Sequence, residues 1–220
     1  MNIDKLRDTP LFRDLDDAEI AAALRALAAK ETAFDKDETI LHAGTAGARM
    51  GVVLAGSVTV ESNDVWGNRT ILSHIGVGGT FAETYALLEG EPMLVDVVAN
   101  ERSRVLFLRI GGLNALQRDI EPWRVKLTGN LLRISARKNL HLSGRSFHTA
   151  PKSIRGRVMA YLKSVSLRMQ RTAFDIPFDR QQLADYLNVE RSALSRELGN
   201  MRADGLIRVR KNHFEIVRSE

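Results

Sequence analysis

The 220-residue sequence contains no cysteine. Without thiols the chain cannot form a disulfide, hold a thiolate-ligated iron–sulfur cluster or sense redox state through a cysteine. Long apolar runs are also missing, because Arg or Gly interrupts them within about ten residues, whereas a membrane helix needs roughly 20. Residues 1–7 lack the apolar centre of a signal peptide. We therefore expect a cytoplasmic protein that does not cross a membrane.

The net charge is +5, and it is unevenly divided along the chain. Residues 122–220 hold 20 Lys and Arg against 8 Asp and Glu, a net charge of +12, which leaves 12 against 19, or −7, for residues 1–121. A basic second half indicates a polyanionic partner. A membrane surface or RNA is less favoured, since neither an amphipathic anchor nor a platform of stacking aromatics accompanies the basic residues.

Residues 178–198 predict two short helices separated by a tight turn. Asn188 tolerates the left-handed backbone that such a turn requires. Before and after it, apolar residues recur at helical spacing, which predicts a small shared core. These residues are Leu183, Ala184 and Leu187 on the first helix and Ala193, Leu194 and Leu198 on the second.

The opposite side of the second helix carries hydrogen-bonding side chains of the kind that read bases in the major groove. They are Arg191, Ser192, Ser195 and Arg196, at i, i+1, i+4 and i+5. Gly205 then ends the helix, and residues 207–217 alternate apolar and polar side chains around a Lys-Asn turn, which predicts a winged helix-turn-helix. The alternative is an ordinary helical hairpin made soluble by arginine.

Five further residues of this segment are candidate contacts to DNA phosphates, because cations and amides there would neutralise or bind the backbone. They are Arg180, Gln181, Arg208, Arg210 and Lys211.

The first 120 residues combine an acidic-capped helix, ending near Ala29, with many short strands. The strands are predicted at residues 39–41, 50–54, 57–61, 70–75, 95–99 and 104–109, with glycines between them. Such spacing predicts a small barrel or jelly roll. A long helix is expected over residues 122–147, beginning at Pro122. Gly144 and residues 148–151 are expected to form a hinge after it. This helix could cover its own barrel or pair with a second copy.

Three segments, together with the winged motif, resemble the Crp/Fnr family of transcription regulators. They are residues 44–47, residues 51–60 and residues 76–81. The resemblance implies an α+β fold with an N-terminal β-roll (jelly-roll) at residues 1–121, similar to a cyclic-nucleotide-binding domain, a dimerisation helix at 122–148 and a C-terminal winged helix-turn-helix domain at 149–220. It also implies a homodimer that binds a palindromic operator in double-stranded DNA and works with RNA polymerase.

Members of the family that bind cyclic nucleotides carry a Gly-Glu pair and a later Arg-Ser pair that holds the cyclic phosphate. Glu83 matches the Glu, but Ala82 stands for the Gly, and Met93 and Leu94 stand where Arg-Ser would be. A phosphodiester needs a cation or several donors, and Met and Leu supply neither. The sequence therefore argues against cAMP as the effector.

The remaining side chains at this position suit a small neutral, aromatic or cationic molecule. They are Glu83, Thr84, Tyr85, Met93 and Val95, and the resemblance implies that Asn130 or Leu131 of the long helix also faces the pocket. The alternative is a packed barrel that binds no small molecule or responds to another signal.

The five histidines form neither a His-x-His nor a His-x-x-x-His pair, so we expect no metal site and no cofactor. A haem held by a single histidine leaves too little signature to be decided from sequence. We expect a regulator and not an enzyme. The competing hypothesis is a jelly-roll protein that binds a small molecule or is catalytic, like the cupins, with an accessory basic domain.

Overall fold

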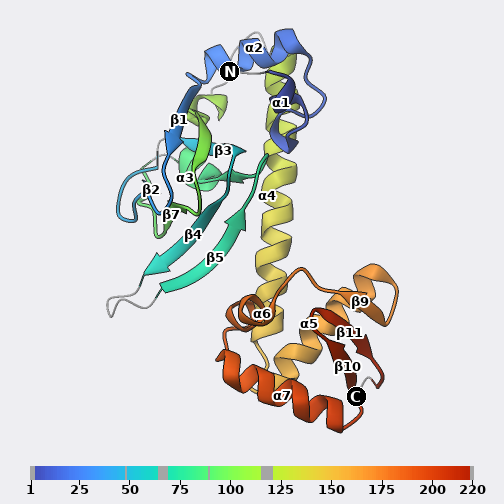
Figure 1. Cartoon of the computed structure of the whole chain (residues 1–220). Coiled ribbons are helices and arrows are strands. Elements are labelled where there is room, and N and C mark those ends of the chain that lie inside the picture. Colours follow the sequence, from blue (N-terminus) through green and yellow to red (C-terminus); the bar gives the residue numbers. More distant parts are fainter. Residues whose placement is uncertain (1–2, 48, 64–68, 89, 115–120, 219–220) are drawn as a thin grey trace. The chain divides into compact units, whose positions relative to one another are not determined.

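The computed structural model describes residues 3–47, 49–63, 69–88, 90–114 and 121–218, and these fall into two compact units (Figure 1). The first unit is Met1–Arg137 and the second is Lys138–Glu220. Helix α4, Pro122–Thr149, contributes residues to both. The separate dimerisation segment 122–148 therefore stays a prediction.

The first unit begins with short helices. They are α1 (Asp4–Arg7), a 3₁₀ turn (Pro10–Phe12) and α2 (Asp17–Ala26). At the start of α2 the Asp16 carboxylate accepts from the Glu19 amide, and the Glu19 carboxylate accepts from the Asp16 amide, so two amides at the helix start are satisfied. The acidic cap predicted from the sequence has this geometry.

Two antiparallel four-stranded sheets form the roll. One has the order β1 (Lys30–Phe34), β8 (Ser103–Leu108), β3 (Met50–Ala55) and β6 (Thr80–Phe81). The other has the order β2 (Thr39–Leu41), β7 (Asp96–Ala99), β4 (Val58–Asn63) and β5 (Arg69–Ile75). The six predicted strands are present to within two residues at each end, whereas β1 and β6 are additions that the sequence analysis missed.

Helix α3 (Glu83–Leu88) follows β6. The interior of the roll is packed with the rings of Phe34, Phe81 and Phe107, which meet edge to face with centroids 6.2 and 6.3 Å apart. Gly51 lies against the ring of Phe81, where any β-carbon would collide with it, so a glycine is needed there.

The second unit contains the last turns of α4 and a small winged domain. Its further elements are α5 (Ile154–Met169), β9 (Ala173–Asp175), α6 (Arg180–Leu187), α7 (Arg191–Ala203), β10 (Ile207–Arg210) and β11 (His213–Ile216). The strands pair in the order β10-β11-β9. The winged helix-turn-helix and the α+β fold predicted from the sequence are confirmed.

The predicted hinge is displaced. His148 and Thr149 still belong to α4, and the break falls between Thr149 and Ser153, whose side chain caps α5 by accepting from the Gly156 amide at 3.0 Å. Pro151 disfavours helical backbone at Ala150, so the proline limits the helix, whereas Gly144 lies inside α4.

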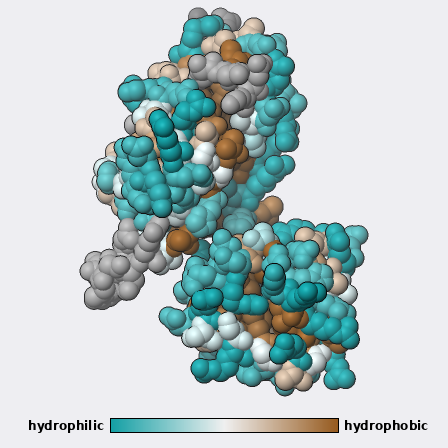
Figure 2. Space-filling view, viewed as in Figure 1, coloured by the Kyte–Doolittle hydropathy of each residue, from teal (hydrophilic) through white to brown (hydrophobic). Residues whose placement is uncertain are grey.

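Within the part of the chain that the structure describes, no helix is long and apolar enough to span a membrane. Figure 2 shows that the visible face is mainly hydrophilic and that hydrophobic residues reach it in separate patches on both units.

Candidate DNA interface and effector site

The turn between α6 and α7 has the geometry that the sequence predicted. Asp179 caps α6 by accepting from the Gln182 amide, and the Gln182 side chain accepts from the Asp179 amide. Asn188 ends the helix with φ 53° and ψ 57°, the left-handed conformation that asparagine tolerates better than most residues. Only three residues therefore separate the two helices.

All four predicted base-reading residues, Arg191, Ser192, Ser195 and Arg196, are exposed on one side of α7. Leu194 and Leu198 on the other side are buried in the core of the domain. None of the four side chains forms a hydrogen bond or an ion pair with a residue that the structure describes. Their donors are thus available to a partner outside the chain.

The carboxylates near Arg196 are bound by a different arginine. Arg155 of α5 contacts Glu197 at 2.7 Å and Asp204 at 2.7 Å. These two hydrogen bonds raise the pKa of Arg155, because they stabilise its charged form. The interaction ties α5 to α7 and leaves Arg196 free of the ion pair that would have made it a purely structural residue.

The five predicted phosphate contacts divide into two groups. Arg210 and Lys211 are exposed at the tip of the wing, and Lys211 has the left-handed φ of 54° that the Lys-Asn turn requires. The other three, Arg180, Gln181 and Arg208, are engaged within the chain.

Arg180 lies over the ring of Phe214, 5.9 Å from its centroid, and donates to the Lys211 carbonyl at 3.3 Å. Burial lowers its pKa. Arg208 pairs with Glu215 across the wing hairpin at 3.1 Å, and Gln181 donates to Asp185 at 2.8 Å. Arg180 therefore helps to hold the wing, and its phosphate role, like those of the other four, stays a prediction.

In the roll, three predicted effector residues meet in one core. Met93 is 1% exposed, and Tyr85 and Val95 pack against the same cluster. The Tyr85 hydroxyl accepts from the Leu94 amide at 3.2 Å, and Gly47 lies so close to Tyr85 that a β-carbon would collide with it. Main-chain bonds join Met93 to Gly44 and Thr45 at 2.7 and 2.9 Å. Glu83 is buried at the start of α3 and Thr84 is exposed.

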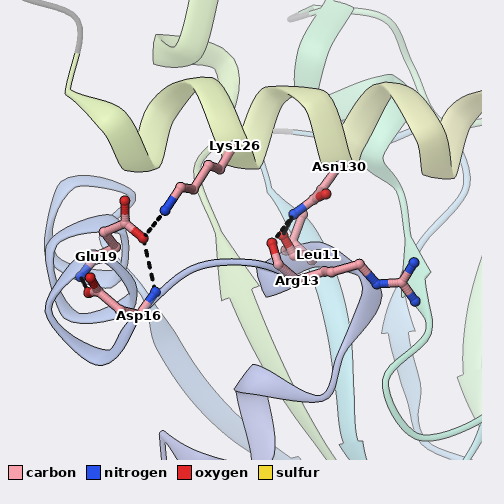
Figure 3. Close-up of polar contacts among 6 residues, drawn as sticks. All are labelled: Leu11, Arg13, Asp16, Glu19, Lys126 and Asn130. Atoms are coloured by element: carbon pink, nitrogen blue, oxygen red, sulfur yellow. Dashed lines mark hydrogen bonds and ion pairs between the residues drawn. The ribbon is translucent and has the colours of Figure 1, made fainter.

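Leu131 belongs to a different core, and the neighbouring Asn130 is buried with its amide directed to Leu11 and Arg13 (Figure 3). The Asn130 amide donates to the carbonyls of Leu11 at 3.1 Å and Arg13 at 2.7 Å, and Leu131 packs with the apolar residues of the N-terminal helices. We expected one of them to face the effector position. The structure instead engages both with the N-terminal segment, whose carbonyls need the donors that Asn130 supplies.

Figure 3 also shows an ion pair beside Asn130. Lys126 contacts Glu19 at 2.7 Å, and the bond from Lys126 is the main reason that the pKa of Glu19 is lowered. The first turns of α4 are thus fastened to α2 by the charged pair, and to the segment before α2, at Leu11 and Arg13, by the buried amide.

Three histidines have polar partners within the chain. The partner of His74 is Thr59 at 3.0 Å, that of His148 is the Tyr186 hydroxyl at 2.9 Å, and that of His213 is Asp175 at 2.9 Å. Among the described residues, no group of three or more His, Cys, Asp or Glu side chains could hold a metal ion.

Two arginines that the sequence analysis missed bind the turn of the helix-turn-helix. Arg145 of α4 donates to the carbonyls of Asp185 and Tyr186, and Arg157 of α5 donates to those of Leu187 and Asn188. Their partners lie 30 to 41 residues away in the sequence, so no local pattern marks them.

Comparisons with known families agree with this architecture. Residues 31–119 match the family described as cyclic nucleotide-binding domain, and residues 156–220 match the Crp-like helix-turn-helix domain. A comparison with curated proteins gave no match.

Solved structures of similar fold cover nearly the whole chain. The catabolite activator protein of Thermus thermophilus is 25% identical, with 94% of this chain and 93% of that chain covered and a TM-score of 0.52. The c-di-GMP-responsive regulator CLP of Xanthomonas campestris is 17% identical, with 93% and 100% covered and a TM-score of 0.62. FixK2 of Bradyrhizobium japonicum is 21% identical, with 86% and 93% covered and a TM-score of 0.54.

Proposed function

Because the chain belongs to the Crp/Fnr family of transcription regulators, we propose that it binds a palindromic DNA operator as a homodimer and responds to a small molecule other than cAMP. The exposed side of α7 is the observation that carries this proposal. Family membership also implies contact with RNA polymerase and a role in regulation, not catalysis.

Two arginines on α7 supply the chemistry for reading bases. A guanidinium can donate two hydrogen bonds to the O6 and N7 acceptors of guanine, and Arg191 and Arg196 are near enough along the helix for both to enter one major groove. The hydroxyls of Ser192 and Ser195 can bond to any base. The exposed Arg210 and Lys211 of the wing supply cations for DNA phosphates, whose contacts carry the salt-dependent part of the affinity.

An exposed apolar face of α4 supports the homodimer. Val125, Leu132, Leu140 and Phe147 are 60% to 75% exposed, although side chains of this type gain about 1.5–3 kcal/mol each when buried. They recur at i, i+7, i+15 and i+22, which keeps them on one side of a helix with 3.6 residues per turn. The residues between them on that side are small, which favours a close approach of a second copy: Gly129, Ala136 and Ser143.

Met93 and Leu94, which stand where cyclic-nucleotide-binding members of the family carry Arg-Ser, support an effector other than a cyclic nucleotide. Met93 is buried where a cation would have to meet the phosphate, and Leu94 beside it is exposed. Neither side chain can offset the desolvation of a phosphodiester. A small neutral, aromatic or cationic molecule would meet Tyr85 and Val95 instead.

DNA binding is tested with a duplex that the protein itself selects from a random pool. Fluorescence anisotropy at several salt concentrations should give a slope of log K against log salt of about −5 or steeper, if at least six Lys and Arg engage phosphates per dimer. A slope shallower than about −2 would contradict the assignment.

The homodimer is tested by Leu132→Glu. This side chain is exposed in the single chain, so the substitution should leave the fold intact while charging the face that we assign to the partner. Sedimentation velocity should show a monomer, whereas Arg137→Gln, which makes the same change of charge on another side of α4, should remain a dimer. A wild-type monomer at micromolar concentration would overturn the proposal.

The effector is sought by thermal-shift screening of metabolites against the purified protein, with c-di-GMP included because CLP is described as responsive to it. A ligand at 100 times its Kd stabilises the folded protein by about 2.7 kcal/mol. A stabilising compound that also changes operator affinity would support the proposal. If c-di-GMP were the only compound with both effects, the proposed neutral, aromatic or cationic ligand class would be wrong.

A further inference from the structure

The C-terminal end of α6 is held by side chains from two other helices. The last four carbonyls of a helix have no partner within it. Here the Ala184 carbonyl accepts from the amide of Val189 at 3.0 Å. Arg145 donates to Asp185 and Tyr186 at 2.9 and 3.0 Å, and Arg157 donates to Leu187 at 3.1 Å. Each carbonyl at this end thus has a donor, and two of the donors are cations at the negative end of the helix.

Arg145 belongs to a row of α4 side chains that surrounds Tyr186. The guanidinium lies 5.6 Å from the centroid of the Tyr186 ring. His148 bonds to the Tyr186 hydroxyl at 2.9 Å, and the His141 ring lies 6.1 Å from that of Tyr186. Positions 141, 145 and 148 are spaced i, i+4 and i+7, so one side of α4 holds α6 through three successive turns.

This side of α4 differs from the apolar side. Leu140 and Phe147, 75% and 73% exposed, lie on the stripe that we assign to the second copy of the chain. Counting 100° per residue, the side with His141, Arg145 and His148 is turned from Leu140 and Phe147 by about 120°. One helix can therefore pair with its copy and hold the helix-turn-helix at the same time.

We propose that Arg145 is the positioning residue that sets the half-site spacing accepted by the dimer. The inference rests on the proposed homodimer. A guanidinium that bonds two successive carbonyls fixes the direction of α6 relative to the end of α4, and α7 follows α6 after a three-residue turn. If this contact between α4 and α6 is stiff, the α7 helix of each subunit meets DNA at one distance and one angle from its α4. Inserting one base pair moves a half-site by about 3.4 Å and rotates it by about 35°.

The test measures affinity for duplexes with altered spacing. The operator selected by the wild-type protein is compared with versions carrying one or two base pairs inserted at its centre, and with a single half-site. Wild-type protein should lose at least about tenfold in affinity for each inserted pair. Arg145→Ala should lose less than about threefold, while its affinity for the single half-site stays within about threefold of the wild type.

Three further variants separate positioning from general stability. Arg145→Lys keeps the charge but lacks the rigid planar fork that holds the two carbonyls in one direction, so it should resemble Arg145→Ala. Tyr186→Phe removes the hydroxyl and leaves the carbonyl, so it should keep the spacing preference. Arg137→Ala removes one exposed charge from α4 and should behave as the wild type.

The outcomes distinguish this inference from the proposed function. If wild-type protein discriminates spacing and Arg145→Ala and Arg145→Lys discriminate equally well, the inference is wrong and the homodimer stands. If wild-type protein binds all spacings alike, the contact between α4 and α6 is not stiff and the inference is wrong, whereas sedimentation velocity decides separately whether the protein is a homodimer.

Discussion

The outward side chains of α7 differ from the side chains in α3 and just after it in what they contact within the chain. Arg191, Ser192, Ser195 and Arg196 are exposed and make no hydrogen bond or ion pair to a described residue. In the roll, Met93 is buried, and Tyr85 is bonded to the main chain of Leu94. The outward side of α7 is thus available to a partner, whereas the position that we propose for the effector is filled by the chain's own residues. A ligand there would have to displace packed side chains, which couples its binding to movement of the roll.

The largest effect should come from α7. Arg196→Ala should weaken the free energy of binding to the selected operator by about 1–3 kcal/mol per half-site, because two hydrogen bonds to one base are removed with the guanidinium. The loss on random DNA should be much smaller. Competition anisotropy with both duplexes gives the ratio of affinities. Lys211→Ala is the matched control, since loss of a phosphate contact should weaken both duplexes alike. If Arg196→Ala lowers the Tm and leaves the ratio unchanged, the residue is structural.

Asn130 should contribute to stability and not to DNA binding, because its donors are used inside the first unit. Asn130→Ala leaves the carbonyls of Leu11 and Arg13 without a donor and should destabilise this unit by about 1–3 kcal/mol. Urea denaturation followed by the fluorescence of Trp123, which is buried in the same core, measures the loss. Arg137→Ala should change the stability by less than about 0.5 kcal/mol. An unchanged midpoint would show that water replaces the amide.

The sequence encoded the winged domain well because its signals are local. Asn188, Gly205 and Lys211 each adopt the positive φ that their turn requires. Asparagine and glycine, at the first two positions, are residue types that tolerate this backbone. Strand β1 was missed because Lys30–Phe34 lacks clear alternation and gains its place by pairing with β8. Arg145 and Asn130 could not be assigned either, since their partners are 40 to 119 residues away.

A smaller, pH-dependent effect is expected in the second unit. Burial, followed by the nearby positive charges of Arg168 and His141, lowers the pKa of His148, which also packs against Tyr161 and Tyr186. The unfolded chain, with an ordinary histidine pKa of about 6.5, then binds a proton before the folded chain does. Stability should therefore decrease as the pH falls below about 6.5, until the folded pKa is passed. Thermal melts from pH 7.5 to 5 should show a weaker decrease for His148→Gln, and an unchanged pH dependence would contradict this assignment.

The smallest effect should be that of cyclic nucleotides. Millimolar cAMP or cGMP should change neither the Tm nor the operator affinity, because Met93 and Leu94 offer no donor to the phosphate and the main chain of Met93 is bonded to Gly44 and Thr45. The double substitution Met93→Arg with Leu94→Ser restores the cation and the hydroxyl, yet it should still not create binding. Ala82 has a φ of 59° where the binding members of the family carry glycine, and Tyr85 continues to fill the space beside Gly47. Isothermal titration calorimetry of both proteins is the measurement. Saturable micromolar binding by the unmodified chain would mean that another cation meets the phosphate, and Arg102→Ala and Arg104→Ala would then identify it.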